Sequence, residues 1–234
     1  MLPDFELSCT LFDKYGLTLN REKYEKLQTY SDLLVEWNQK INLTAIVEPE
    51  QILIKHFLDS AILLTKCEIS CESTIIDVGT GAGFPAIPLK IMLPDLKITL
   101  LDSLSKRITF LENVCNNLNI SANFIHGRAE DYARLPEYRE KFDISCARAV
   151  ASLPVLSEYC LPFVKIDGSF IAMKGPNEAV EQSSDAIRIL GGIFEKCVDY
   201  SVEEEQRRII VIKKISQTPT KFPRNSAQIK KKPL

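Results

Sequence analysis

Apolar residues recur with a helical period over the first 66 residues of the chain. They stand at intervals of three and four, on one face of a long helix, at Tyr24, Leu27, Tyr30, Leu34, Trp37 and Ile41. Asn20 is a suitable N-cap for this helix. A second helix is predicted to begin at Pro49, because proline is favoured at the first helical position. Residues 1–66 are therefore predicted to form an N-terminal helical cap.

From residue 67 onward the pattern changes to short apolar runs, separated at first by stretches of helical character. Short apolar runs bounded by turn residues are typical of buried strands. We expect seven strands, at residues 74–78, 97–101, 123–126, 142–146, 168–173, 194–200 and 208–214. Helices between the first five predict an α/β domain with a doubly wound, Rossmann-like sheet over residues 67–215. Residues 216–234 then form a basic C-terminal tail.

A glycine-rich turn follows the first predicted strand. After Asp77, glycine falls at every second position, at Gly79, Gly81 and Gly83. Glycine lets the backbone turn tightly and approach a ligand, and the next helix directs its free N–H groups at that ligand. A dinucleotide-binding turn needs G-x-G-x-x-G, but Phe84 stands where its last glycine is required. The pattern D-x-G-x-G-x-G instead resembles motif I of the S-adenosylmethionine-dependent methyltransferases.

The ends of the second and third predicted strands support a nucleoside-containing ligand. Asp102 ends the second strand about 20 residues beyond the glycines, where a carboxylate can accept both ribose hydroxyls. Ala129 and Glu130 follow the third strand. Ligands of open α/β sheets lie over the carboxyl ends of neighbouring strands. Ala129 and Glu130 are therefore expected to line an adenine ring.

The fourth strand is informative because of what it lacks. Enzymes that methylate amino groups carry Asn or Asp before Pro-Pro-aromatic here, whereas this chain has Cys146-Ala-Arg148-Ala149. Cytosine-C5 methylation needs a cysteine nucleophile, but Cys146 lacks the partner residues of that mechanism and is interpreted as core. Arg148 stands at the carboxyl end of a central strand, and its guanidinium suits a carboxylate, a phosphate or a guanine edge.

Two positions in the cap are candidates for more than packing. Asn42 follows the long helix. His56 and Asp59 stand three residues apart on the second helix, hence on one face. A pair of this kind serves either as a structural hydrogen bond or as part of a site, and the residues alone leave both readings open.

Charge is distributed unevenly along the chain. The formal net charge is −2, yet residues 207–234 hold nine Lys or Arg and no acid, so the rest carries −11. Such asymmetry indicates either a polyanionic partner for the tail or a solubilising tail. Seven cysteines without framework spacing and only two histidines argue against disulfides and zinc, and favour a reducing cytosol. The first residues lack a secretory pattern, and no apolar run approaches a membrane span.

Taken together, these motifs resemble the bacterial 16S ribosomal RNA guanine-N7 methyltransferases, the glucose-inhibited-division B family. The resemblance covers almost the whole chain. The parts that carry it are specific when taken together. They are Trp37-Asn38 with Asn42-Leu-Thr44, His56-Phe-Leu-Asp59-Ser60, Asp77 to Pro85 with Pro88-Leu89, Leu100 to Arg107, Ala147-Arg148-Ala149, Lys174-Gly175, Arg208, and Pro223-Arg224 with the final Lys232-Pro-Leu234. The chain departs from the family pattern with Ala86 in place of a glycine, and with Ala227 and Ile229 in the tail where Gly and Pro are common.

The resemblance implies a class I methyltransferase fold, S-adenosylmethionine as cofactor, and 16S ribosomal RNA or the small ribosomal subunit as partner. The implied cofactor site, joined to the acids and glycines already described, comprises Asp77, Gly79, Gly81, Gly83, Phe84, Asp102, Ala129, Glu130 and Arg148. The implied RNA-facing residues are Asn42, His56, Lys106, Arg107, Arg128, Lys174, Arg208 and Arg224. Arg148, His56 and Asn42 are expected to position the reactants rather than to shuttle protons.

Two other functions fit parts of the pattern. One is a methyltransferase of a small molecule or a protein, with a merely solubilising tail. The other is a non-catalytic protein that keeps the fold and binds the ribosome.

Overall fold

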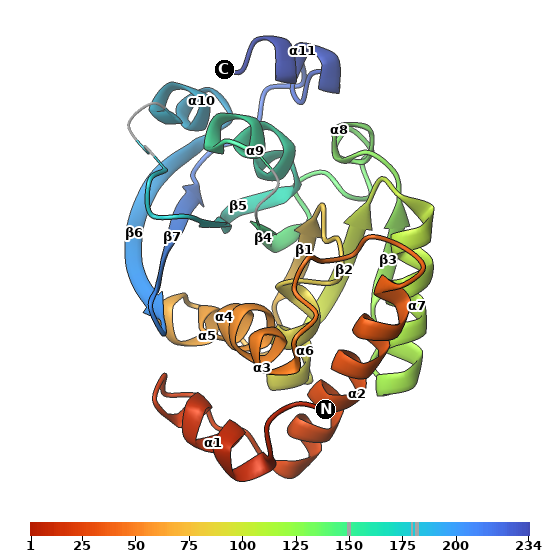
Figure 1. Ribbon diagram of the computed structural model, residues 1–234. Coiled ribbons are helices and arrows are strands. Elements are labelled where there is room, and N and C mark those ends of the chain that lie inside the picture. The colour runs from red at the N-terminus through yellow and green to blue at the C-terminus, as the bar shows by residue number, and fades with distance from the viewer. Residues whose placement is uncertain (149–150, 179, 181–182) are drawn as a thin grey trace.

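A seven-stranded mixed sheet forms the centre of the computed structural model, which describes residues 1–148, 151–178, 180 and 183–234 (Figure 1). The strand order is β3-β2-β1-β4-β5-β7-β6. The first five strands are parallel, and β7 runs antiparallel to both of its neighbours. The strands are β1 (Thr74–Val78), β2 (Lys97–Asp102), β3 (Asn123–His126), β4 (Phe142–Arg148), β5 (Val164–Lys174), β6 (Gly192–Val202) and β7 (Glu205–Lys214).

This sheet confirms the predicted α/β architecture. The predicted bounds of the last four strands are too short, because β4 runs on to Arg148, β5 starts at Val164, and β6 and β7 form one long hairpin. Hairpin strands on a sheet edge carry polar residues on their exposed face, so their apolar pattern covers only part of their length. Ala149, quoted with the end of the fourth strand, lies outside the described residues.

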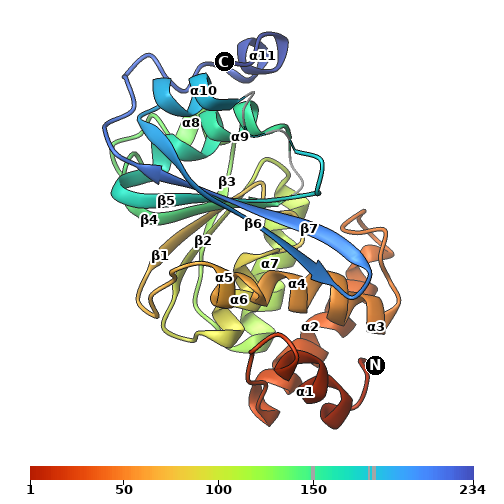
Figure 2. The same cartoon turned by 90° about the vertical axis from the view of Figure 1, so that its left-hand side faces the viewer.

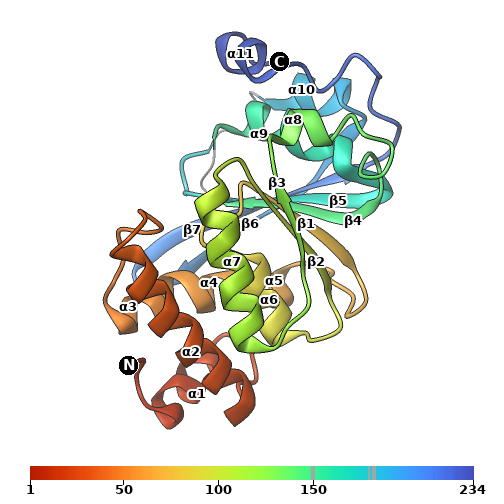
Figure 3. The same cartoon turned by 90° about the vertical axis from the view of Figure 1, so that its right-hand side faces the viewer.

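Helices cover both faces of the sheet, and each face has its own core (Figures 2 and 3). The N-terminal cap and the helices α6 (Ala86–Met92) and α7 (Ser105–Leu118) pack on one face. The other face carries α8 (Ala129–Tyr132), α9 (Leu153–Cys160), the 3₁₀ turn η2 (Leu161–Phe163) and α10 (Ser184–Ile189). The cap shares a continuous apolar core with α6 and α7.

The cap is helical, as predicted, and contains six elements. They are α1 (Phe5–Asp13), α2 (Arg21–Asn38), α3 (Pro49–Ile52), the π-helical turn η1 (Leu53–Leu58), α4 (Asp59–Ala61) and α5 (Leu63–Lys66). Asn20 caps α2 through a side-chain bond from the backbone N–H of Lys23, and Pro49 opens α3. The predicted helix through Ile41 is too long. It ends at Asn38, whose side chain instead binds the backbone of Leu43 and Thr44.

The C-terminal segment 216–234 is folded against the face that carries α9, and it ends in α11 (Ser226–Lys231) (Figure 1). Phe222 and Ile229 are buried in that face. Arg224 holds Glu158, a fully buried carboxylate, at 2.6 Å. The segment is thus a docked part of the fold. None of the helices in the described part of the chain is long and apolar enough to cross a membrane.

Candidate active site

The glycine turn between β1 and α6 is held by hydrogen bonds to β2 and to the cap. The N–H groups of Gly79 and Thr80 donate to the carbonyl of Leu101 at the end of β2. Tyr30 of the cap donates to the carbonyl of Ala82. Gly79, Gly81 and Gly83 all have positive φ, of 71°, 60° and 97°, which other residues adopt only with strain, so the sequence pattern reflects a backbone requirement.

Asp77 and Gly83, both predicted to bind the cofactor, lie behind this turn. The Asp77 carboxylate accepts from the Thr80 hydroxyl at 2.8 Å and from the N–H of Ala86 at 3.3 Å, and it is fully buried. Burial raises its pKa to about 7. A Cβ on Gly83 would lie 2.6 Å from the Tyr30 hydroxyl. In this structure both residues stabilise the turn through contacts on its core side, and neither lines the cavity described below.

A cavity of about 810 Å³ opens over the turn and the carboxyl ends of β1, β2 and β4. The other seven predicted cofactor residues line it, namely Gly79, Gly81, Phe84, Asp102, Ala129, Glu130 and Arg148. Residues far away in the sequence close it, since Thr44 comes from the cap and Ser226 and Lys230 come from the C-terminal segment. The parallel strands place their carboxyl ends side by side under the cavity, as expected for a doubly wound sheet.

The geometry of this cavity fits S-adenosylmethionine. A Cβ added to Gly81 would meet nothing closer than the Gly79 carbonyl at 3.9 Å, so the bare backbone faces open space. The Asp102 carboxylate is held by the N–H groups of Gly81 at 3.0 Å and Leu104 at 2.9 Å, and by Arg107 at 3.2 Å. These contacts orient a carboxylate at the end of β2, where a nucleoside's ribose hydroxyls need an acceptor.

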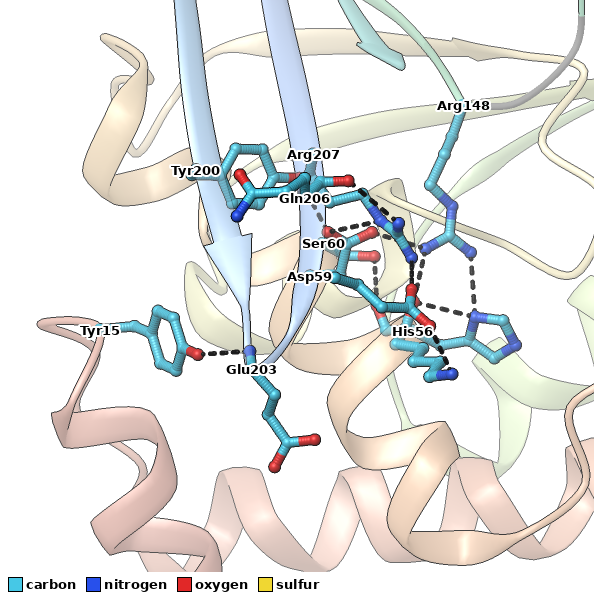
Figure 4. A network of polar contacts seen from close by, with 11 residues as sticks. Tyr15, His56, Asp59, Ser60, Arg148, Tyr200, Glu203, Gln206 and Arg207 are labelled. Carbon is cyan, nitrogen blue, oxygen red and sulfur yellow. Dashed lines mark hydrogen bonds and ion pairs between the residues drawn. The ribbon is translucent and has the colours of Figure 1, made fainter. Parts of the chain in front are cut away.

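Arg148 and His56 form the wall of the cavity next to the cap (Figure 4). Arg148 donates to the carbonyl of Lys55 at 3.1 Å, to Asp59 Oδ2 at 3.3 Å and to His56 Nδ1 at 3.3 Å. Its guanidinium lies over the ring of Phe84, 4.7 Å from the centroid. The ion pair, the hydrogen bonds and the cation–π contact together fix the guanidinium in one orientation.

His56 is a neutral side chain in this wall. Burial, with the positive charge of Arg148 beside it, lowers its pKa to about 3. Nδ1 lies near both Arg148 and the carbonyl of Lys55, and because a guanidinium can only donate we assign Nδ1 as an acceptor. The proton is then on Nε2, which lies 2.9 Å from the Thr44 hydroxyl. The ring stacks on Phe84 with centroids 4.5 Å apart.

The structure connects His56 and Asp59 through a third residue. Both contact Arg148, and Asp59 also accepts from the hydroxyl of Tyr200 on β6 at 2.7 Å. Sequence reasoning did not single out Tyr200, because nothing near it in the chain marks a residue that meets Asp59 across 141 positions. Thr44 was predicted only as part of the motif Asn42-Leu-Thr44. Its position just after the long cap helix was a usable signal for a side chain that contacts His56.

The predicted RNA-facing residues fall into two groups. Lys106 is exposed and precedes the cavity-lining Arg107, which is half-buried, while Arg128 is exposed and also lines the cavity. Lys174, Arg208 and Arg224 are engaged within the fold, with Glu178, Asp199 and Glu158 respectively. Asn42 is exposed and lies outside the set of residues that line the cavity. Roles in RNA binding for all of these residues stay predictions.

Comparison with known proteins identifies the family. Residues 23–210 match the family model described as rRNA small subunit methyltransferase G, GidB. This chain belongs to that family. A "Ribosomal RNA small subunit methyltransferase G" of Acetivibrio thermocellus is 52% identical over 226 residues, which are 94% of this chain and 92% of the relative. One of the same name from Clostridium perfringens is 48% identical, covering 98% of each chain.

Solved structures share the fold. A precorrin-6y C5,15-methyltransferase of Geobacter metallireducens superimposes with a TM-score of 0.53 over 76% of this chain and 95% of its own, at 13% identity. A geranyl diphosphate methyltransferase in complex with SAM does so with a TM-score of 0.53 at 12% identity, over 67% of this chain and 84% of its own. The predicted class I methyltransferase fold and the family resemblance are thereby confirmed.

Proposed function

We propose that this protein transfers the methyl group of S-adenosylmethionine to N7 of one exposed guanine in 16S ribosomal RNA. Family membership supports the rRNA methyltransferase activity, and the fit of the glycine-turn cavity supports the cofactor. The observation that carries the choice of acceptor atom is the wall of that cavity. Neither Arg148 nor His56, whose pKa is lowered to about 3, can take up a proton near neutrality.

Guanine N7 is an acceptor that suits such a wall. It carries a lone pair in the plane of the ring and no proton, so methylation there requires alignment of the reactants and no general base. Cys146 does not offer the alternative of a covalent mechanism, because burial raises the pKa of its thiol far above that of a reactive cysteine.

The residues of the glycine-turn cavity have separable tasks in this reaction. When bound, S-adenosylmethionine supplies a methyl group on a positively charged sulfur. Asp102 would accept the ribose hydroxyls, Gly81 allows close contact with the backbone, and Ala129 and Glu130 would line the base. Arg148, fixed by Asp59, provides oriented donors at the wall, and neutral His56 adds no second positive charge there.

The RNA partner explains the exposed basic residues next to the cavity. Lys106 and the C-terminal Lys230 to Lys232 are exposed, so their charges can neutralise phosphates. Arg128 is also exposed, and it contacts Glu130 at 3.8 Å and Ser226 at 2.8 Å. Duplex RNA hides guanine N7 in a deep and narrow groove. The target guanine is therefore an unpaired or otherwise accessible one. The proposed site of action is the cytoplasm, where ribosomal RNA is modified.

Radiolabelled methyl transfer tests this proposal. The wild-type protein is given small-subunit particles, free 16S RNA, a protein extract and a metabolite pool, and label should enter only the particles or the RNA. Replacing the labelled guanine by 7-deazaguanine removes the N7 lone pair and keeps the shape of the base. Methylation should then be lost. Persistent transfer to the 7-deaza substrate would exclude N7, and label in protein or metabolites alone would exclude RNA.

A further inference from the structure

A second cavity, of about 380 Å³, adjoins the first at Arg148 and His56. These two side chains line both cavities, so ligands in the two cavities would meet beside them. The second cavity is formed where the ends of β5 and β6 meet the cap, and Met173, Gly175 and Tyr200 belong to its lining. Its volume is within the range of small-ligand pockets, about 300–1,000 Å³.

The lining of this cavity combines apolar surfaces with a basic rim. Ile46, Met173 and Tyr200 offer aliphatic, thioether and aromatic surface suited to a flat ring. Lys55 and Arg207 stand among them, about a third or less exposed, and both contact the carboxylate of Glu205. Arg207 also lies 4.0 Å from the carboxylate of Asp59, which belongs to the lining. A neutral planar group with an anion attached matches this combination, and a nucleotide of RNA is such a group.

We propose that this second cavity receives the target guanine, turned out of its stack, with its phosphates at the basic rim. This inference rests on the proposed function and adds the place where the acceptor base binds. The base would enter from the cap side with N7 directed past Arg148 and His56 into the first cavity, because N7 must contact the methyl carbon directly for the bond to it to form as the bond to sulfur breaks. Extrusion of a base into a pocket costs a few kcal/mol, least for an unpaired base, which agrees with an accessible target.

Arg148 supplies a reason for choosing guanine. Three of its N–H groups are engaged with Lys55, His56 and Asp59, and the remaining two of a guanidinium's five have no partner among the residues that the structure describes. Guanine carries the acceptor O6 beside N7, whereas adenine carries an amino group there. An N–H of Arg148 directed at this edge would donate a hydrogen bond to O6 of guanine and leave N7 free. The same N–H would face the amino group of adenine, which is also a donor, so adenine would be disfavoured.

Gly175 offers a way to close the cavity without disturbing the fold. It is exposed, its φ is ordinary, and a Cβ added to it would meet no atom within 4 Å. Gly175→Trp therefore places an indole at the mouth of the second cavity. Ile46→Trp does the same from the cap side. Ile193→Trp is the matched control, because Ile193 is 52% exposed on β6 and lines neither cavity.

The expected result is a split between the two ligands. Gly175→Trp and Ile46→Trp should lower kcat/KM for RNA by about 100-fold, while the Kd for S-adenosylmethionine, measured by calorimetry, changes less than about two-fold. Ile193→Trp should behave as wild type in both. With the wild-type enzyme, inosine at the target position should be methylated, since it keeps O6 and N7, and adenosine should not.

Two results would overturn the inference and leave the proposed function intact. One is wild-type RNA kinetics in both tryptophan variants. The other is loss of cofactor binding in both, which would assign the second cavity to the cofactor instead. Methylation of adenosine as fast as guanosine would remove the role given to Arg148. Failure of the wild-type protein to methylate RNA would instead contradict the proposed function itself.

Discussion

Asp59 of the cap holds Arg148 at the end of β4 through an ion pair of 3.3 Å between Oδ2 and Nη1. Its other oxygen accepts from the hydroxyl of Tyr200 at 2.7 Å, so the cap, a central strand and an edge strand meet at one carboxylate. Asp59 is 3% exposed. The cap thereby fixes the guanidinium that lines both cavities, a role that covering the sheet does not require.

Asp59→Asn should destabilise the protein and reduce methyl transfer. It leaves a buried guanidinium without its counter-charge, and breaking such a pair costs about 3–5 kcal/mol. Tyr200→Phe removes only a hydrogen bond and should cost about 1–3 kcal/mol. Urea unfolding of the two single variants and the double variant measures their coupling. Additive effects would show that the three side chains do not act as a unit.

Asp102→Ala should weaken cofactor binding. The variant loses the carboxylate that we propose as acceptor for the ribose hydroxyls, and a hydrogen bond to a charged group is worth about 1.5–3 kcal/mol. Calorimetric titration with S-adenosylmethionine measures the loss, and the melting temperature shows whether the variant is folded. Asp185→Ala is the control, because it removes an exposed carboxylate that lines neither cavity. Unchanged affinity in folded Asp102→Ala would disprove the ribose assignment.

The stability difference between wild type and His56→Gln should depend on pH. The unfolded histidine takes up a proton near its ordinary pKa of 6.5, whereas the folded one stays neutral down to about 3. Below pH 6.5 the unfolded state therefore binds more protons, and wild type loses stability relative to the variant as the pH falls. The expected slope is at most about 1.4 kcal/mol per pH unit between these values. Urea unfolding from pH 4 to 8 measures it, and a pH-independent difference would mean an exposed, ordinary histidine.

The chemical step of methyl transfer should be insensitive to pH between about 6 and 9, because an acceptor without a proton needs no general base. Single-turnover rates with saturating RNA measure this step. Asp77, with its pKa raised to about 7, titrates in the same range from behind the glycine turn. Asp77→Asn is therefore the control. A titrating limb that persists in this variant would reveal a general base and contradict the proposed acceptor.

Replacing Lys230, Lys231 and Lys232 by Gln should weaken RNA binding and flatten its salt dependence. Each phosphate contact contributes about −0.7 to −0.9 to the slope of log affinity against log salt. Binding titrations at several salt concentrations give the slope. Lys14, Lys40 and Lys97, which are exposed elsewhere, form the matched control triple. Equal slopes for both triples and wild type would make the C-terminal lysines a solubility feature.

The sequence by itself determined the local parts of this protein. The strand that carries Asp77, the alternating glycines and Asp102 at the end of β2 were all predicted, because periodicity and positive φ constrain residues close in the chain. Ala129 and Glu130 were predicted from their position after the third strand. The family resemblance added Phe84 and Arg148 to the cofactor site, and all four residues line the cavity.

Tertiary structure decided what depends on contacts between distant segments. Asp77 and Gly83 belong to the same sequence motif as Gly79 and Gly81, but they lie on the core side of the glycine turn. Their packing against Ala86 and Tyr30 determines which side of the turn faces the cavity. The basic tail is docked, since Arg224 finds the buried Glu158 66 residues away. Tyr200 joins Asp59 and Arg148 only when β6 packs beside the cap. Periodicity within one helix or strand cannot encode such a meeting, because it arises from the way the whole chain packs.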